Sequence, residues 1–142
     1  MRRWKGIVIH HSVSDDVSWA TIDRWHRENG WNGIGYHFVI RANGMIEPGR
    51  SLDVWGAHAL NPRPSRNPSH IGIVLTGNFN EAHPTLAQQN SLAYLIGGLM
   101  NRFGIDFSEI EQHHSECPGK NFPWEGLKFK IKLLSGEEDK IE

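Results

Sequence analysis

The sequence predicts an α/β fold in which one mixed central β-sheet is flanked by helices within a single domain. Short runs of β-branched residues alternate with amphipathic segments of helical period, which indicates alternating strands and helices. One clear hairpin signal beside these segments makes the expected sheet a mixed one. The length of 142 residues suits one domain, and a hydrophobic share of 38% is enough for a core without cross-links.

Four mostly apolar runs, bounded by turn signals, predict strands. They cover residues 6–10, 35–41, 45–47 and 70–76, and residues 105–112 form a further short strand or a connection. The sequence Ala42-Asn43-Gly44 predicts the hairpin between the second and third strands. Three prolines and almost no apolar residues between positions 61 and 69 predict an exposed loop.

Cap residues and helical periodicity predict three helices. Ser18 caps one that ends near residue 28, and a last helix covers residues 124–134. Thr85, with a glutamine three residues later, forms a capping box for the longest helix, which ends near residue 103. The predicted core face of that helix consists of Leu92, Leu95, Ile96 and Leu99. Gly97-Gly98 weakens it by up to ~1 kcal/mol per glycine, and close packing on the sheet would be a reason to keep them.

The folded domain is expected to cover residues 1–134, followed by an acidic, polar tail over 135–142 that frays. A formal charge of −1 and scattered basic residues give no bulk attraction to nucleic acid or to anionic membranes. The apolar run at residues 7–9 is too short for a signal peptide or a membrane span. We therefore expect synthesis in the cytoplasm and no membrane insertion.

Potential metal ligands follow the predicted strands at two places. His10-His11 ends the first strand, and His113-His114 shares one short loop with Cys117 after the last. A single histidine is usually a surface or hydrogen-bonded core residue, and a lone cysteine is usually a buried thiol. Two such pairs at strand ends, one beside the only cysteine, favour a zinc site with three protein ligands. Its open fourth position would activate water for hydrolysis, whereas a structural site would close with four ligands.

Tyr36 and His37 lie in the second predicted strand, where neighbouring side chains point to opposite faces. One of the two can therefore face a pocket while the other packs in the core. The Tyr36 hydroxyl is suited to donate a hydrogen bond to a developing oxyanion. By itself, a plain strand-forming aromatic explains the same residue equally well.

Motifs along most of the chain carry a family resemblance. In order, they are residues 7–12 (IVIHHS), 25–26 (WH), 30–31 (GW), 33–40 (GIGYHFVI), 44 (G), 47–50 (EPGR), 56–59 (GAHA), 67 (N), 71–73 (IGI), 77–79 (GNF) and 117–124 (CPGKNFPW). At these residues the sequence resembles the zinc-dependent N-acetylmuramoyl-L-alanine amidases of the type-2 amidase family. That family includes phage lysozyme-amidases and animal peptidoglycan recognition proteins. The resemblance runs from about residue 5 to 130 and implies the single-domain fold of that family, with residues 1–134 as the amidase catalytic domain.

The resemblance implies one zinc ion per chain, held by two histidines and a cysteine. His10 matches the first ligand because it directly follows the apolar strand, and Cys117 matches the thiolate ligand before Pro-Gly. The loop before the cysteine is shorter than usual in the family, so the remaining ligand is His113 or His114. The register after Ile110 favours His113, while His114 begins a string that looks like the family's His-x-acidic pattern.

Further site residues also follow from the resemblance. Tyr36 matches the tyrosine that helps to stabilise the tetrahedral intermediate, and His58 matches a groove residue that binds near the substrate. Weaker candidates for lining or supporting the groove are Trp31, Arg50 and Asn67. Ser115 stands where the family often has lysine or threonine, so it can donate a hydrogen bond but brings no charge. No general base is recognisable, since Glu116 is close in sequence but has no clear family counterpart.

The resemblance implies hydrolysis of the amide bond between N-acetylmuramic acid and L-alanine in peptidoglycan. We expect a phage or prophage endolysin that acts on the cell wall after release, with a holin as the partner that opens the membrane. A cytoplasmic recycling amidase is the alternative. The rival interpretations are a non-catalytic peptidoglycan-binding module, a regulator that binds a polymerase, and a structural zinc protein. The cysteine favours the enzyme, because binding modules of this fold typically lose it.

Overall fold

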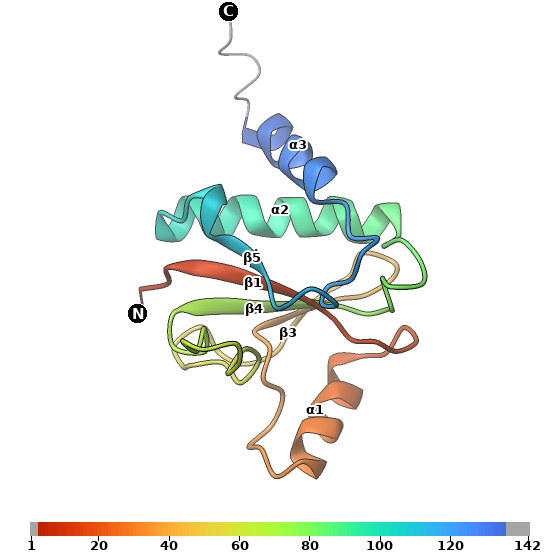
Figure 1. Cartoon of the computed structure of the whole chain (residues 1–142), viewed down its shortest axis with the longest axis vertical. Coiled ribbons are helices and arrows are strands. Elements are labelled where there is room, and N and C mark those ends of the chain that lie inside the picture. The colour runs from red at the N-terminus through yellow and green to blue at the C-terminus, as the bar shows by residue number, and fades with distance from the viewer. Residues whose placement is uncertain (1–2, 136–142) are drawn as a thin grey trace, which may run out of the picture.

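One five-stranded sheet lies between helices in the computed structural model of the chain, which describes residues 3–135 (Figure 1). The strands are β1 (Gly6–His11), β2 (Phe38–Ile40), β3 (Ile46–Pro48), β4 (His70–Leu75) and β5 (Ile110–Gln112). The helices are α1 (Trp19–Glu28), α2 (Leu86–Phe103) and α3 (Trp124–Ser135), with a short 3-10 turn at Phe107–Glu109. Helix α2, against which α3 packs, covers one face of the sheet, and α1 lies on the other (Figure 1).

The strand order across the sheet is β3-β2-β4-β1-β5. Strand β1 pairs in parallel with both β4 and β5, and β2 pairs in parallel with β4. Only the hairpin partner β3 runs antiparallel, against β2. The predicted mixed sheet flanked by helices is therefore confirmed, and the two longest strands, β1 and β4, are its buried centre.

The two faces of the sheet bury different sets of side chains. Ile7 and Ile9 of β1 pack with Leu92 and Ile96 of α2 in the main core. Because side chains alternate along a strand, His10 points to the opposite face, where its register partner Val74 packs against α1. The α1 face is thus the side of the sheet on which the first predicted ligand lies.

The second strand is shorter than the prediction for residues 35–41. Regular pairing covers only Phe38–Ile40, and Tyr36 and His37 precede it. Their backbone is still hydrogen-bonded, because the N–H of His37 donates to the Gly72 carbonyl at 2.8 Å and the Tyr36 carbonyl accepts from Arg50 at 2.8 Å. The prediction was wrong at the N-terminal end of this strand. There the hydrogen bonds to Gly72 on one side and to Arg50 on the other do not continue the regular ladders of β2.

Helix α2 begins and ends where the sequence predicts. The Thr85 hydroxyl accepts from the backbone N–H of Gln88, the Gln88 side chain returns to the Thr85 N–H, and Gly104 ends the helix at φ 67°. The proposed reason for Gly97-Gly98 is wrong, since a Cβ at either position would meet nothing within 4 Å. These glycines instead border an apolar cavity.

Helix α1 is capped differently from the prediction. The Ser18 side chain makes no capping hydrogen bond. The carboxylate of Glu47 in β3 accepts from the Trp19 N–H at 2.8 Å instead, which ties the helix to the hairpin. Ile22 of α1 is buried, whereas Trp19 in its first turn is 42% exposed. Tertiary contact thus replaces a local cap.

The C-terminal boundary lies one residue beyond the predicted helix end, because Ser135 belongs to α3. The remainder of the predicted polar tail, residues 136–142, lies outside the described residues. None of the helices within residues 3–135 combines the length and the apolar composition that a membrane crossing requires.

Asp16 joins the segment before α1 to the hairpin and to the end of β4. Its carboxylate accepts from the Arg41 guanidinium at 3.0 Å, the Thr76 hydroxyl at 2.7 Å and the Ala42 N–H at 3.0 Å. These contacts, led by the hydrogen bond from Arg41, lower the pKa of Asp16 from 3.8 to about 2. A lowered carboxyl pKa contributes stability that is fully present above about pH 4 and is lost as the pH falls through about 2.

We therefore expect Asp16→Asn to lower the free energy of unfolding at pH 7 by about 0.5–1 kcal/mol, a value reduced for the solvent-exposed position of the carboxylate. The difference from wild type should shrink as the pH falls below about 4 and vanish below about pH 2, as followed by urea unfolding across pH. The control is Asp15→Asn, since the Asp15 side chain has no hydrogen bond or ion pair within residues 3–135. An equal effect of both variants would contradict the role of Asp16.

Candidate active site

Two predicted ligands reach the α1 face of the sheet from adjacent strands. His10 lies near the end of β1, and His113 directly follows β5, which pairs with β1. Ile110 of β5 packs in the core beside α2, so alternation turns His113, three residues later, to the same face as His10. The centroids of the two imidazole rings are 4.8 Å apart.

Cys117 returns to these rings through a tight turn. The N–H groups of His113 and His114 donate to the Cys117 carbonyl at 3.0 and 3.1 Å, and the Cys117 N–H donates to the His114 carbonyl at 3.0 Å. The Cys117 Sγ lies 3.7 Å from His10 Nδ1. One potential ligand atom from each of His10, His113 and Cys117 lies within 4.8 Å of the other two. The fold therefore brings together side chains 107 residues apart in the sequence.

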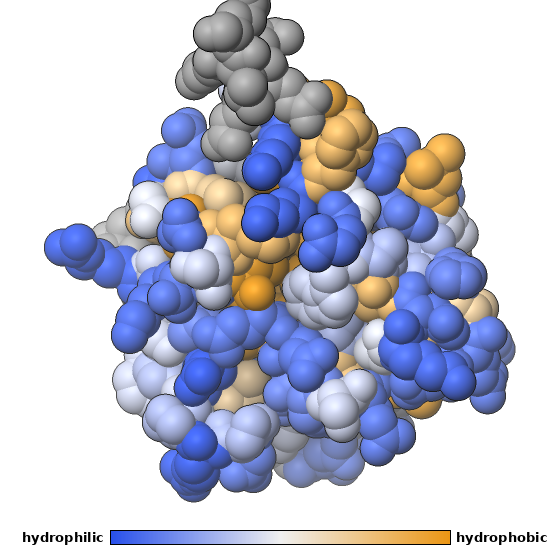
Figure 2. Space-filling model, turned by 45° about the horizontal axis from the view of Figure 1, so that its top comes forward, coloured by the Kyte–Doolittle hydropathy of each residue, from blue (hydrophilic) through white to orange (hydrophobic). Residues whose placement is uncertain are grey.

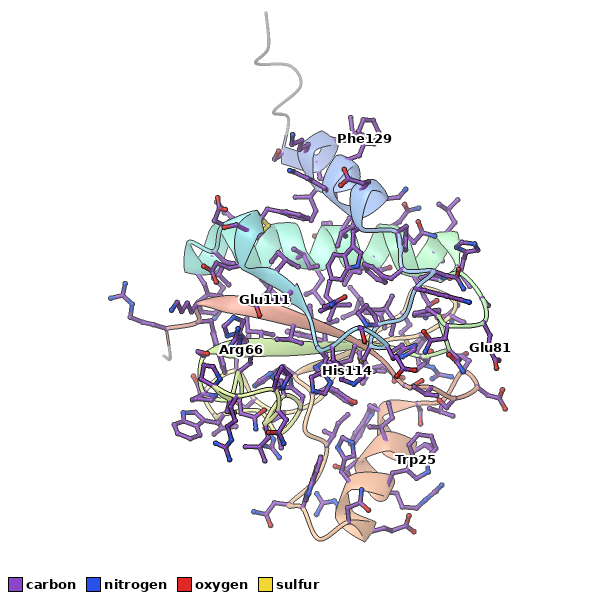
Figure 3. All side chains as sticks on the ribbon, in the orientation of Figure 1. Trp25, Arg66, Glu81, Glu111, His114 and Phe129 are labelled. Carbon is purple, nitrogen blue, oxygen red and sulfur yellow. The ribbon has the colours of Figure 1, made fainter. Side chains whose placement is uncertain are left out.

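His114, the alternative ligand, lies outside this group. Its side chain is exposed, and its Nδ1 accepts a hydrogen bond from the Glu116 N–H at 3.2 Å within the turn. Figure 3 labels His114 where the chain leaves β5. The geometry thus favours His113, the residue that the strand register also favours.

Hydrogen bonds determine which nitrogen of each ligand histidine is free. The Nε2 of His113 lies 2.7 Å from the Asn61 carbonyl, which can only accept, so Nε2 carries the hydrogen and Nδ1 is free. The Nε2 of His10 lies 2.9 Å from the Nδ1 of His58. Its Nδ1 is the nitrogen that faces Cys117. Both imidazoles can therefore present Nδ1 to a common ion.

Burial determines the charge of these groups. It lowers the pKa of His10 well below 6.5, with a further contribution from the neighbouring His58, and it raises the pKa of the Cys117 thiol to about 11. The groups by themselves are neutral at pH 7, and a cation bound among them would favour the thiolate. Two imidazoles and a thiolate are donors that zinc prefers. The residues present thus fit a zinc ion and make a possible metal site.

Tyr36 borders the same group. Its ring centroid is 5.0 Å from that of His10, and its side chain is half-buried. Within residues 3–135, no group hydrogen-bonds its hydroxyl. Burial raises the pKa of Tyr36 above its ordinary value of 10, so the hydroxyl keeps its proton at neutral pH and remains available as a donor.

A groove of about 480 Å³ opens beside the possible metal site. Its walls include Tyr36 and His113 together with the three predicted groove residues Trp31, His58 and Asn67. Trp31 lines the groove and is 43% exposed. An elongated ligand lying in the groove would therefore pass directly by His113 and the Tyr36 hydroxyl.

Comparison with known proteins identifies the family. The family model described as N-acetylmuramoyl-L-alanine amidase (Amidase_2) matches residues 1–120, which is most of the chain. The chain belongs to this family. It is therefore an enzyme that cleaves the amide bond between N-acetylmuramic acid and L-alanine in peptidoglycan, and the predicted family, fold and enzyme class are confirmed.

Individual relatives agree with the family. The chain is 33% identical to an endolysin of Enterobacteria phage T3 over 122 residues, which cover 80% of this chain and 77% of the relative. Among solved structures, it is similar to the N-acetylmuramoyl-L-alanine amidase LysC from Clostridium intestinale URNW, at 40% identity and a TM-score of 0.83, covering 92% and 86% of the two chains. Drosophila PGRP-LB is 30% identical at a TM-score of 0.71, with 92% and 83% covered.

Two residues that were not predicted for the site also lie beside it. His26 of α1 lines the groove, accepts from the Gly35 N–H at 2.8 Å through Nδ1, and packs against Trp31 with ring centroids 4.6 Å apart. His11 accepts from the Phe79 N–H at 2.9 Å and lies 2.7 Å from the Glu116 carbonyl, so it holds the turn before Cys117. The pairing of histidines at positions 10 and 11 was the only sequence signal for the second role.

Two further candidates of the amidase lie around the site. Ser115 is exposed at the tip of the turn before Cys117, and its hydroxyl has no hydrogen-bond partner among the described residues. The Arg50 guanidinium donates to the carbonyls of Ile34 at 3.1 Å and Trp55 at 2.8 Å. Arg50 therefore supports the loops beside the groove and does not line it.

Asn67 stabilises the loop of the groove wall that contains His58. Its Oδ1 accepts from the N–H groups of His58 at 2.9 Å and Ala59 at 2.7 Å. We expect Asn67→Ala to lower the free energy of unfolding by about 1–3 kcal/mol, because two amide groups lose their acceptor. Asn67→Asp keeps an acceptor oxygen and should retain most of the stability in urea unfolding. Equal losses in both variants would show that the oxygen is not what matters.

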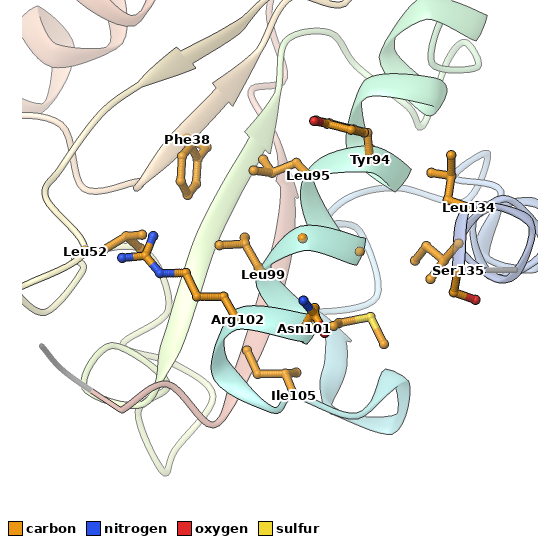
Figure 4. A pocket seen from close by; sticks show the side chains of 14 residues that line it. Phe38, Leu52, Tyr94, Leu95, Leu99, Asn101, Arg102, Ile105, Leu134 and Ser135 are labelled. Atoms are coloured by element: carbon orange, nitrogen blue, oxygen red, sulfur yellow. The ribbon is translucent and has the colours of Figure 1, made fainter. Parts of the chain in front are cut away.

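A larger cavity than this groove lies elsewhere in the amidase. It measures about 820 Å³ between α2, α3 and β2, and apolar side chains such as Leu95, Leu99 and Ile105 surround it (Figure 4). Figure 2, which brings the α2 and α3 side forward, shows apolar surface in a hollow among hydrophilic side chains. The described residues that line it include no histidine, cysteine or carboxylate.

A second group of possible metal ligands, His70 with Glu109 and Glu111, is explained by internal pairing. Glu111 accepts from Arg66 at 3.0 Å and lies 3.2 Å from the His70 ring, and Arg66 and Glu111 are labelled in Figure 3. The other nitrogen of His70 contacts the Ser69 hydroxyl at 2.7 Å. Both nitrogens of His70 are thus already engaged.

Proposed function

We propose that this amidase is zinc-dependent, with one ion held by His10, His113 and Cys117, and that it acts as an endolysin. The observation that carries the proposal is the convergence of one potential ligand atom from each of these three side chains within 4.8 Å, beside a groove that His113 lines. A bound zinc ion would supply Lewis-acid chemistry, by activating water and polarising the scissile carbonyl. The donor set of two imidazoles and one thiol supports zinc over the oxygen-preferring ions.

The chain's own residues would bind the substrate and stabilise charge. The Tyr36 hydroxyl would donate a hydrogen bond to the oxyanion that develops on the carbonyl, since that hydroxyl has no other partner among the described residues. Ser115 would add a second, uncharged donor beside Cys117. Trp31, His58 and Asn67 would line the muramyl-peptide site, with the exposed Trp31 ring packing on the apolar face of a sugar.

The endolysin role is supported by relatives with that name from several phages. We infer that the protein acts on the cell wall after it is released from the cytoplasm, and that a phage-encoded form would depend on a holin for this release. Expression from inside a bacterium, with and without a membrane-permeabilising protein, tests the dependence. Lysis that needs no such protein would contradict it.

The proposal is tested by measuring zinc content and muropeptide products together, in the wild type and in Cys117→Ala. We expect one zinc per wild-type chain, new L-alanine amino termini without new reducing sugar ends, and loss of both zinc and product in the variant. Zinc binding without any cleavage would instead favour a peptidoglycan-recognition module. A wild-type protein that binds no zinc would overturn the assignment of all three ligands.

A further inference from the structure

His58 contacts a metal-site histidine directly. Its Nδ1 lies 2.9 Å from His10 Nε2, and its own Nε2 lies 3.0 Å from the main-chain carbonyl of His70. The carbonyl can only accept, so the hydrogen of His58 resides on Nε2 and its Nδ1 is a bare acceptor. His10 must then carry its hydrogen on Nε2 and leave Nδ1, which faces Cys117, free. One unbroken hydrogen-bond chain thus selects the tautomer of His10.

The space for the His58 ring is provided by two glycines. A Cβ at Gly72, in the middle of β4, would lie 2.5 Å from the ring, and one at Gly56 would lie 2.4 Å from it. Neither glycine has a positive φ. Glycine is therefore needed at both positions because the His58 ring approaches the backbone closely, and not because of the backbone conformation. The His58 ring packs against both glycines, and a side chain at either position would displace it.

Hydrogen bonds also fix the backbone around His58. Asn67 accepts the N–H groups of His58 and Ala59. Three residues further, the Asn61 carbonyl accepts from His113 Nε2 at 2.7 Å. One loop therefore supports both histidines of the possible metal site, through a side chain for His10 and through a carbonyl for His113.

We propose that His58 is a positioning residue for the metal site, and that it holds His10 with Nδ1 directed at the ion. The inference rests on the zinc site proposed above. Groups that accept the second N–H of a metal-bound histidine set its tautomer and ring orientation, and their loss commonly lowers metal affinity about 10–100-fold. Here the acceptor is a neutral imidazole whose own tautomer is set by the main chain. His58 therefore contributes only its ring face to the groove, because both nitrogens are engaged.

The test compares His58→Leu with His58→Asn. The oxygen of asparagine occupies about the position of the histidine Nδ1 and can accept from His10, whereas leucine of similar size cannot. We expect His58→Leu to bind zinc about 10–100-fold more weakly than wild type, and His58→Asn to recover most of that loss. Zinc affinity is measured by competition with a chromophoric chelator, and the circular dichroism and Tm of the metal-free proteins report whether each variant folds.

The outcomes separate this inference from the zinc proposal. Wild-type protein without zinc would refute the metal site itself. Zinc bound by wild type and equally tightly by His58→Leu would refute only the role of His58, and equal weakening in His58→Leu and His58→Asn would reduce that role to packing. Gly72→Ala, which would displace the ring, should also weaken binding, whereas Gly98→Ala, whose Cβ meets nothing within 4 Å, should not.

A measurement on the wild type needs no variant. In the zinc-loaded protein, nitrogen-15 NMR of the imidazoles should show His10 bound through Nδ1, with a hydrogen-bonded proton on Nε2, and His58 with its proton on Nε2. Coordination of His10 through Nε2 would overturn the inference even though zinc is bound.

Discussion

His113→Ala is expected to abolish zinc binding and to lower amidase activity at least about 1000-fold, whereas His114→Ala should keep both. A bound metal ion contributes several kcal/mol of transition-state stabilisation, and each 1.36 kcal/mol corresponds to a tenfold change in rate. His113 shares the α1 face of the sheet with His10, while His114 is exposed and lies outside the group of potential ligand atoms. The two adjacent residues therefore form a matched pair for the test.

Both variants are compared with wild type in zinc content, in release of L-alanine amino termini from purified cell walls, and in Tm without metal. A similar Tm for the metal-free proteins would exclude a folding defect as the cause of inactivity. The opposite result, with His114→Ala inactive and His113→Ala active, would assign the ligand to His114. Full activity in both variants would remove the histidine pair from the metal site altogether.

Tyr36→Phe is expected to lower kcat about 100–1000-fold, the effect typical of removing one oxyanion donor. Zinc affinity should stay unchanged, because the phenylalanine ring keeps the contacts with His10 and His26. The Tyr36 hydroxyl must be protonated to donate. Since burial raises the pKa of Tyr36 above 10, its ionisation should not lower the activity between pH 7 and 10.

The assay follows kcat and KM on a soluble muramyl peptide, with zinc content measured in the same samples. Loss of zinc in Tyr36→Phe would indicate a structural effect on the metal site. Unchanged kcat would show that Tyr36 does not stabilise the transition state, and Ser115 would then be the next donor to replace. A fall in wild-type kcat near pH 8 or 9 would have to come from another group.

The sequence predicts those parts of the fold that depend on interactions between residues close together in the chain. The capping box of Thr85 and Gln88, the αL glycine at position 104 and the apolar periodicity of α2 all act within one or two helical turns. The ends of β2 and the cap of α1 were not predictable in this way. Tyr36 and His37 pair with different neighbours, and α1 is capped by Glu47 from a different element.

In the candidate site, too, some residues were predictable from local motifs and others needed the tertiary structure. His10 and Cys117 were proposed from short motifs, His10 at the end of the first predicted strand and Cys117 in the loop that follows the last one. The choice between His113 and His114 rested on register, and the structure adds the reason, since only His113 faces the same side of the sheet as His10. Sequence patterns assign such faces only where the strand is correctly placed.

By itself, the sequence determined the fold class, the family and the set of potential ligands, because periodicity and motifs are properties of neighbouring residues. Only the tertiary structure decided which nitrogens are free, through partners such as His58, the His70 carbonyl and the Asn61 carbonyl. Those partners lie 12 to 52 residues from the groups that they contact. Hydrogen bonds across such distances depend on the packing of loops on the sheet, which no local pattern specifies.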